Sequence, residues 1–303
     1  MKLSRQTRDT INIIIFLVVA AFLIITYVVY PLNRTKAIMG RYNVDDFAED
    51  SVMVNDPAAW TEAGLAADSF TVESDGLARL ACLYVRPDSA EHDTTRGTVV
   101  LLHDDEDDRD SVMTMAALLA AEGYAVVAYD QRASGRSTAK YHGDGQYEAN
   151  DLAETIRYLD LRERIHHPLV VVGFSRGADG ALLAAREDRR IDAVVAVNPY
   201  LTSSRMLEML RQRHDSYWFP FYRTTMWWWY EIRSGYDALY RDVDQIEAVV
   251  CHTLLLLPAK AAGEAEVVKL RELSEADLLQ VESAPSDRET LARRVQSFVA
   301  ELR

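Results

Sequence analysis

Residues 173–177 read Gly-Phe-Ser-Arg-Gly, and this stretch decides the fold class. It matches the G-x-S-x-G pattern, in which a serine sits on a sharp turn between a strand and a helix. Leu169-Val-Val-Val-Gly173 before it is a short β-branched run typical of a buried parallel strand, and residues 178–186 are rich in helix-forming alanine and leucine. Small glycines on both sides leave room for strained backbone, so Ser175 is a candidate nucleophile. The alternative is an ordinary turn with an idle serine.

Strand-like and helix-like segments alternate along most of the chain. Two extended runs flank Asp75-Gly76, which predicts a hairpin over residues 70–86. Further strands are expected at residues 98–103, 124–130, 169–173, 193–197, 253–257 and 277–281, and helices at 111–122, 147–161, 178–186, 264–273 and 287–302. This alternation predicts an α/β fold, a mostly parallel sheet with helices on both faces. Ligands bind such sheets at the carboxyl ends of the strands.

The N-terminal region predicts a membrane anchor. Residues 1–10 form a short tail, and Ile11 to Tyr30 follow without a charge, long enough to cross a bilayer as a helix. Pro31 comes directly afterwards and no small-residue cleavage site is present, which favours a retained anchor over a signal peptide or a buried core helix. Three basic residues on each side leave the orientation open, and the short tail makes an extracytoplasmic globular domain the expectation.

Composition excludes several function classes. With 33 basic and 47 acidic residues the net charge is −14, so nucleic acid is not an expected partner. Cys82 and Cys251 are too few and too far apart for a disulfide framework or a metal site, which favours core packing. We therefore expect neither a cofactor nor a metal.

Three motifs carry a resemblance to a known family. Val99-Val-Leu-Leu-His103, the segment Tyr129-Asp-Gln-Arg-Ala-Ser-Gly-Arg-Ser137 and the serine turn at 173–177 resemble the α/β-hydrolase superfamily from about residue 66 to the end. Residues 147–159 are similar to its membrane-anchored or secreted serine hydrolases of esterase and peptidase type. The resemblance implies a connector at residues 31–65 and a hydrolase domain at residues 66–303.

The resemblance also implies a helical lid insert at residues 199–250, where four of the five tryptophans lie. Three interpretations stay open. The insert forms an apolar substrate pocket, dips into the membrane interface beside the anchor, or uses its aromatic side chains for a small core of its own. The candidate lid and pocket residues are Trp218, Phe221, Trp227, Trp228 and Trp229.

By resemblance, Ser175 is the nucleophile of a serine hydrolase. The oxyanion hole uses the backbone N–H of Arg176 and one from Asp104 or Asp105, because charge builds on the substrate carbonyl oxygen in the transition state. The family usually has glycine after His103, whereas residues 104–110 of this chain carry six carboxylates. These charges oppose an oxyanion. A divalent-cation site is one interpretation of the cluster, and a solvated acidic loop is the favoured one.

The other two members of a catalytic triad are not at their usual positions. The loop after the strand at 253–257 offers only Glu264 as the acid, and no histidine follows His252. His142 and His214 are the remaining candidates for the general base, without which a serine hydroxyl is a poor nucleophile.

Two functions follow from this incomplete triad. In one, the chain is a membrane-anchored serine hydrolase that cleaves an apolar ester or amide through Ser175. In the alternative, it is a catalytically inactive α/β-hydrolase-fold protein that binds a small molecule or a protein at the membrane.

Overall fold

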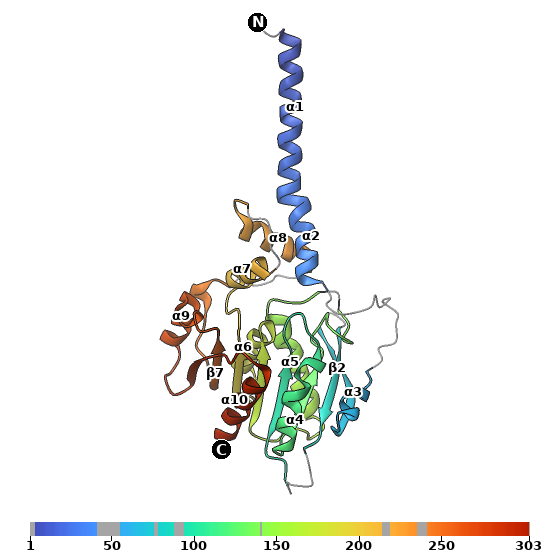
Figure 1. The fold of residues 1–303 in the computed structure, drawn as a ribbon, viewed down its shortest axis with the longest axis vertical. Helices are drawn as coiled ribbons and strands as arrows, with labels where there is room; N and C mark the ends of the chain where they lie inside the picture. The colour runs from blue at the N-terminus through green and yellow to red at the C-terminus, as the bar shows by residue number, and fades with distance from the viewer. Residues whose placement is uncertain are drawn as a thin grey trace. The chain divides into compact units, whose positions relative to one another are not determined.

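The computed structural model describes residues 4–40, 55–75, 78–87, 94–139, 141–213, 219–234 and 241–302. The chain divides into two compact units (Figure 1). The smaller comprises Met1–Gly40 with Leu207–Ala238, and the larger comprises Arg41–Met206 with Leu239–Arg303. Segments far apart in the sequence therefore share a unit.

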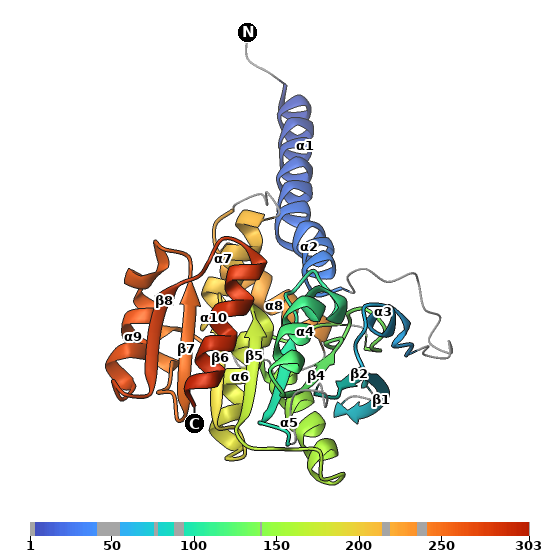
Figure 2. The same ribbon diagram turned by 60° about the horizontal axis from the view of Figure 1, so that its bottom comes forward.

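The larger unit is built on one twisted sheet (Figure 2). Within the described residues its strands are ordered β1-β2-β4-β3-β5-β6-β7-β8. β1 pairs antiparallel with β2 and β2 antiparallel with β4, whereas every other pairing is parallel. The strands are β1 Ala67–Ser74, β2 Ala78–Val85, β3 Thr98–Leu102, β4 Ala125–Tyr129, β5 Leu169–Phe174, β6 Ala193–Val197, β7 His252–Leu257 and β8 Leu279–Ser283. The predicted hairpin, formed by β1 and β2, and the predicted parallel sheet are both present.

Helices cover both faces of this sheet, as the alternation predicts. Val99 and Leu101 of β3 face the cluster that includes α4 (Met113–Ala121) and α10 (Arg288–Glu301). Val100 and Leu102 face the opposite cluster, which includes the helices α5 Gln146–Asp160, α6 Arg176–Glu187 and α9 Ala265–Leu273. Successive side chains of a strand point to opposite faces, so a strand buried on both sides is apolar throughout.

Shorter elements complete the larger unit. They are α3 Ala58–Glu62, the 3₁₀ turns η3 Arg109–Val112, η4 Val243–Gln245 and η5 Ala261–Gly263, and the first residues of α7 Ser203–Arg213. α3 lies in the stretch interpreted as a connector, and its buried Trp60 donates its indole N–H to Asp110 at 2.6 Å. Part of that stretch therefore packs into the hydrolase domain rather than only linking it.

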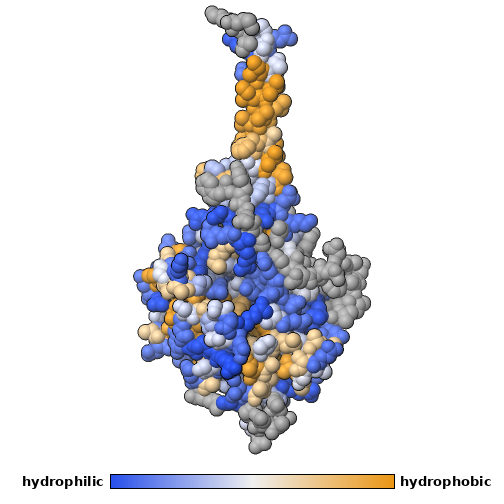
Figure 3. All heavy atoms as spheres, viewed as in Figure 1, coloured by the Kyte–Doolittle hydropathy of each residue, from blue (hydrophilic) through white to orange (hydrophobic). Residues whose placement is uncertain are grey.

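The smaller unit contains the N-terminal helix. α1 Arg5–Ile24, a π-helical turn η1 Ile25–Val29 and α2 Tyr30–Met39 follow one another without a break. Arg5–Lys36 is the one helix among the described residues that is long and apolar enough to cross a membrane, and its exposed apolar side chains form the orange band in Figure 3. The helix continues past the expected end at Tyr30, through Pro31 and on to Met39.

Candidate active site

Ser175 lies on the strained turn that the sequence predicts, between β5 and α6. Its backbone has φ 48° and ψ −115°, a conformation that residues other than glycine rarely adopt. A Cβ at Gly173 would lie 2.4 Å from the carbonyl oxygen of Gly177, and one at Gly177 would lie 2.8 Å from Cβ of Leu102. Both glycines of the motif are thus required by close approach, which explains their spacing around the serine.

The Ser175 side chain has no partner that could activate it. The residue is buried, and its hydroxyl makes no hydrogen bond to any residue in the described parts of the chain. The backbone N–H donates to the carbonyl of Val197 at 2.9 Å, which fixes the turn against β6. Within the described residues, which exclude His214, no side chain is hydrogen-bonded to the Ser175 hydroxyl as a general base would be.

The imidazole of His103, directly after β3, forms hydrogen bonds with backbone groups. Its Nδ1 lies 2.6 Å from the carbonyl oxygen of Asp104, and its Nε2 accepts the N–H of Gln131 at 2.9 Å. The two bonds fix one tautomer, with the proton on Nδ1. Because both ring nitrogens are engaged, the imidazole holds the end of β3 to the segment after β4.

Among the described residues, no hydrogen bond joins Ser175 to His142 or Glu264, the predicted base and acid candidates. His142 is buried with its Nε2 3.4 Å from Oγ of Ser134, and His214 lies outside the described residues. Glu264 forms an ion pair with Nε of Arg205 at 2.7 Å. A triad acid must orient an imidazole, whereas the described partner of Glu264 is an arginine, so its acid role stays a prediction.

The predicted oxyanion donors are already occupied. The N–H of Arg176 donates to Oδ1 of Asp105 at 3.4 Å, and the N–H of Asp105 donates to the Asp104 carboxylate at 2.7 Å. The Tyr200 hydroxyl donates to the second oxygen of Asp105, and Nε of Arg176 lies 3.8 Å from its first oxygen. A buried carboxylate therefore accepts the N–H of Arg176, one of the predicted oxyanion donors.

The remaining acidic residues of the loop at 104–110 have local partners. Asp108 caps η3 by accepting the N–H of Asp110 at 3.0 Å, and Asp107 lies 3.4 Å from Arg288. Within the described residues no group of three or more acidic, histidine or cysteine side chains is arranged to hold a metal ion. The contacts of the loop are those of a capped, ion-paired turn.

Asp179, one turn into α6, holds the loop that follows β6. Its buried carboxylate accepts the N–H groups of Tyr200 at 2.8 Å and Leu201 at 2.7 Å, and Arg241 lies 3.9 Å away. Burial raises the pKa of this carboxyl to about 6. Sequence reasoning missed both Asp179 and the Asp105–Tyr200 contact, because an acidic residue in a helix or loop gives no local sign of its partner.

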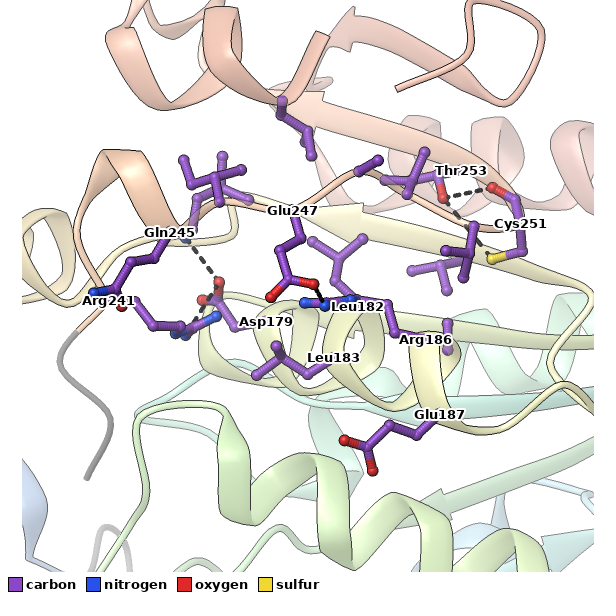
Figure 4. A pocket seen from close by; sticks show the side chains of 18 of the residues that line it. Asp179, Leu182, Leu183, Arg186, Glu187, Arg241, Gln245, Glu247, Cys251 and Thr253 are labelled. Carbon is purple, nitrogen blue, oxygen red and sulfur yellow. Dashed lines mark hydrogen bonds and ion pairs between the residues drawn. The ribbon is translucent and has the colours of Figure 1, made fainter. Parts of the chain in front are cut away.

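A cavity of about 870 Å³ lies between α6 and the segment 241–253, and Asp179 is one of its lining residues (Figure 4). Leu182, Leu183 and Val249 form apolar parts of its wall. Two ion pairs lie in its wall, Asp179 with Arg241 and Arg186 with Glu247. Ser175 is not among its lining residues, so the cavity is separate from the serine turn.

The aromatic residues predicted to form a lid belong to the smaller unit. Phe221 directly precedes α8 (Tyr222–Ser234), which contains Trp227, Trp228 and Trp229, and Trp218 lies outside the described residues. Trp229 donates its indole N–H to the carbonyl of Tyr27 in the N-terminal helix. A lid or pocket role for these side chains stays a prediction.

Comparison with known protein families shows to which family the chain belongs. A family model described as serine aminopeptidase, S33, matches residues 93–263, which include the serine turn and more than half of the chain. The chain belongs to the S33 serine aminopeptidase family. The match confirms the relationship to serine hydrolases that the motifs indicate. No curated protein matches it.

Solved structures similar to this S33 member are α/β-hydrolases with low sequence identity. An esterase from Pyrococcus furiosus is 19% identical with a TM-score of 0.57, covering 87% of this chain and 96% of its own. A putative aryl esterase from Burkholderia cenocepacia is 17% identical with a TM-score of 0.54, covering 78% and 99%. An α/β serine hydrolase homologue from Coxiella burnetii is 15% identical with a TM-score of 0.50, covering 77% and 96%. These likenesses confirm the α/β-hydrolase fold.

Proposed function

We propose that this S33 family member is a membrane-tethered α/β-hydrolase that does not perform acyl transfer and instead serves as a binding module. One observation carries the proposal, namely the buried Asp105 carboxylate bonded to the N–H of Arg176. Its ligand is a small molecule or a protein met at the membrane surface.

The chemical argument concerns charge. In acyl transfer, backbone donors stabilise the oxyanion of the tetrahedral intermediate, and removing one donor costs about 100- to 1000-fold in kcat. Here the Arg176 donor is bonded to a carboxylate, which repels an oxyanion. The described residues also give Ser175 no imidazole, so the proton of its hydroxyl has no acceptor.

The membrane tether rests on the composition of the N-terminal helix. Arg5–Lys36 meets the length and apolarity of a spanning segment, and α1 has no buried residue that would make it a core helix.

Fluorophosphonate labelling of the purified full-length chain tests the proposal, with Ser175→Ala as the matched control. We expect no labelling of the folded protein above that of the control. Circular dichroism verifies that both proteins are folded. Labelling that disappears in Ser175→Ala would show an activated serine and overturn the proposal.

The retained serine turn favours a second candidate, a serine hydrolase acting on an apolar ester or amide through Ser175. A positive φ at a serine costs about 1–3 kcal/mol, and strain of this kind gathers at active sites. In this case His214, outside the described residues, is the predicted base to replace first. Loss of labelling in His214→Gln, with labelling kept in His142→Gln, would support it.

A further inference from the structure

The helix α8 has an apolar face that the described residues leave exposed. Trp228 is 54% exposed and Ile232 is 53% exposed, and their spacing of four places them on one side of the helix. Phe221, directly before the helix, is 79% exposed. Large apolar side chains gathered in this way mark an interaction surface rather than ordinary exposure.

The rest of the aromatic segment packs on the N-terminal helix of the same unit. The ring of Phe219 meets Tyr27 edge-on with centroids 5.3 Å apart, and Tyr30 at 6.0 Å. Trp227 stacks on Tyr230 with centroids 5.1 Å apart. The aromatic cluster of the insert is therefore joined to the anchor at Tyr27 and Tyr30.

A backbone bond fixes this junction. Pro31 has no N–H and cannot donate the helical hydrogen bond to the carbonyl of Tyr27, four residues earlier. That carbonyl accepts the indole N–H of Trp229 at 2.9 Å. In an apolar environment a freed carbonyl requires such a partner, so α8 completes the helix where the apolar run ends.

The two units differ in net charge, and this difference favours the exposed face of α8 as the surface that meets an anionic bilayer. After the apolar run, the smaller unit has six basic and four acidic residues, a net charge of +2, whereas the larger unit has 24 and 42, a net charge of −18. Arg223 of α8 is also exposed. Basic and aromatic residues together are typical of segments that lie at an anionic bilayer surface.

We propose that Phe221, Trp228 and Ile232 form a second membrane contact, which inserts into the headgroup region of an anionic phospholipid bilayer beside the anchor. The inference rests on the membrane tether of the proposed function. Tyr27 and Tyr30 lie at the end of the apolar run, where aromatic residues meet the interface, and α8 is bonded to the helix at that level. The contact holds α8 in the plane of the interface.

Depth-dependent quenching in lipid nanodiscs tests the proposal on the full-length chain. The discs contain phosphatidylcholine and phosphatidylglycerol, with a doxyl-labelled lipid as the quencher. An environment-sensitive fluorophore is attached to Trp228→Cys or to Ile232→Cys in a Cys251→Ala background. Cys82 stays, because it is fully buried in the core. The matched controls are Val18→Cys in α1 and Leu161→Cys, which is 71% exposed in the larger unit.

We expect quenching at positions 18, 228 and 232, about twofold or more above that at position 161. Quenching at position 18 without quenching at 228 and 232 overturns the second contact and leaves the tether standing. Absence of quenching at position 18 overturns both. A label-free measurement guards against misfolded variants, since brominated lipid should quench tryptophan fluorescence less in Trp228→Phe than in the unmodified chain, and equal quenching overturns the contact.

Discussion

The two units of this chain differ in how they are assembled. In the larger unit, strands and helices alternate along the chain, and the strands from β3 to β7 are almost wholly buried between the helices on both faces. In the smaller unit, a helix from the N-terminus meets an aromatic helix that comes about 200 residues later, through the bond between Trp229 and Tyr27. The first kind of assembly can be predicted from local pattern and the second cannot.

The largest expected effect concerns the serine turn of the larger unit. Gly173→Ala should destabilise the fold by about 4 kcal/mol, because its Cβ would lie 2.4 Å from a backbone oxygen that cannot easily move. Gly263→Ala is the matched control, since a Cβ there meets nothing within 4 Å. Urea unfolding measures both, and similar midpoints would show that the turn is less tightly packed than described.

A second effect tests the burial of Asp179. The pKa of this carboxyl is raised to about 6 in the folded chain, so its protonated form is favoured by folding. Its contribution to stability is complete below pH 4 and is lost as the pH rises to 6, by about 3 kcal/mol. We expect the unfolding free energy of Asp179→Asn, which cannot ionise, to rise relative to the unmodified chain over this range. A difference independent of pH would contradict the assignment.

The smallest effect belongs to the smaller unit. Trp229→Phe should remove the bond to the Tyr27 carbonyl, which contributes about 1 kcal/mol, and should speed amide hydrogen exchange in η1. The neighbouring Trp228→Phe is the matched control, because the described residues give its indole N–H no hydrogen bond. Equal exchange rates in the two variants would show that the bond between Trp229 and Tyr27 does not stabilise η1, which would contradict the described assembly of the smaller unit.

The fold was predictable because its signals are local. The runs at 98–103 and 169–173 are continuous and β-branched, and they became the adjacent strands β3 and β5. The last strand was expected at 277–281 and is observed at Leu279–Ser283, because its mixed, partly exposed residues mark its ends poorly. The continuation of the N-terminal helix to Met39 was missed, because a proline inside a helical run was interpreted as its end.

The site was predictable only in part. The glycine spacing gives the turn at Ser175 directly, since it reflects a backbone constraint. The position of the Asp105 side chain depends on how the loop after β3 approaches the N-terminus of α6, which no pattern in residues 104–110 encodes. The sequence predicted that these acidic residues oppose a developing oxyanion by their charge. The structure shows that one of them, Asp105, accepts the N–H of Arg176.

The Asp105 carboxylate has a further consequence for ligand binding. It is an anion attached by a few bonds to the protein whose donor it occupies, so its effective concentration at the N–H of Arg176 is far above that of any solute. An external carboxylate or phosphate must compete for the N–H of Arg176 with the Asp105 carboxylate, which is covalently part of the protein. A helix N-terminus attracts anions in many proteins, and in this chain the first N–H of α6 is already bonded to a carboxylate of the protein itself.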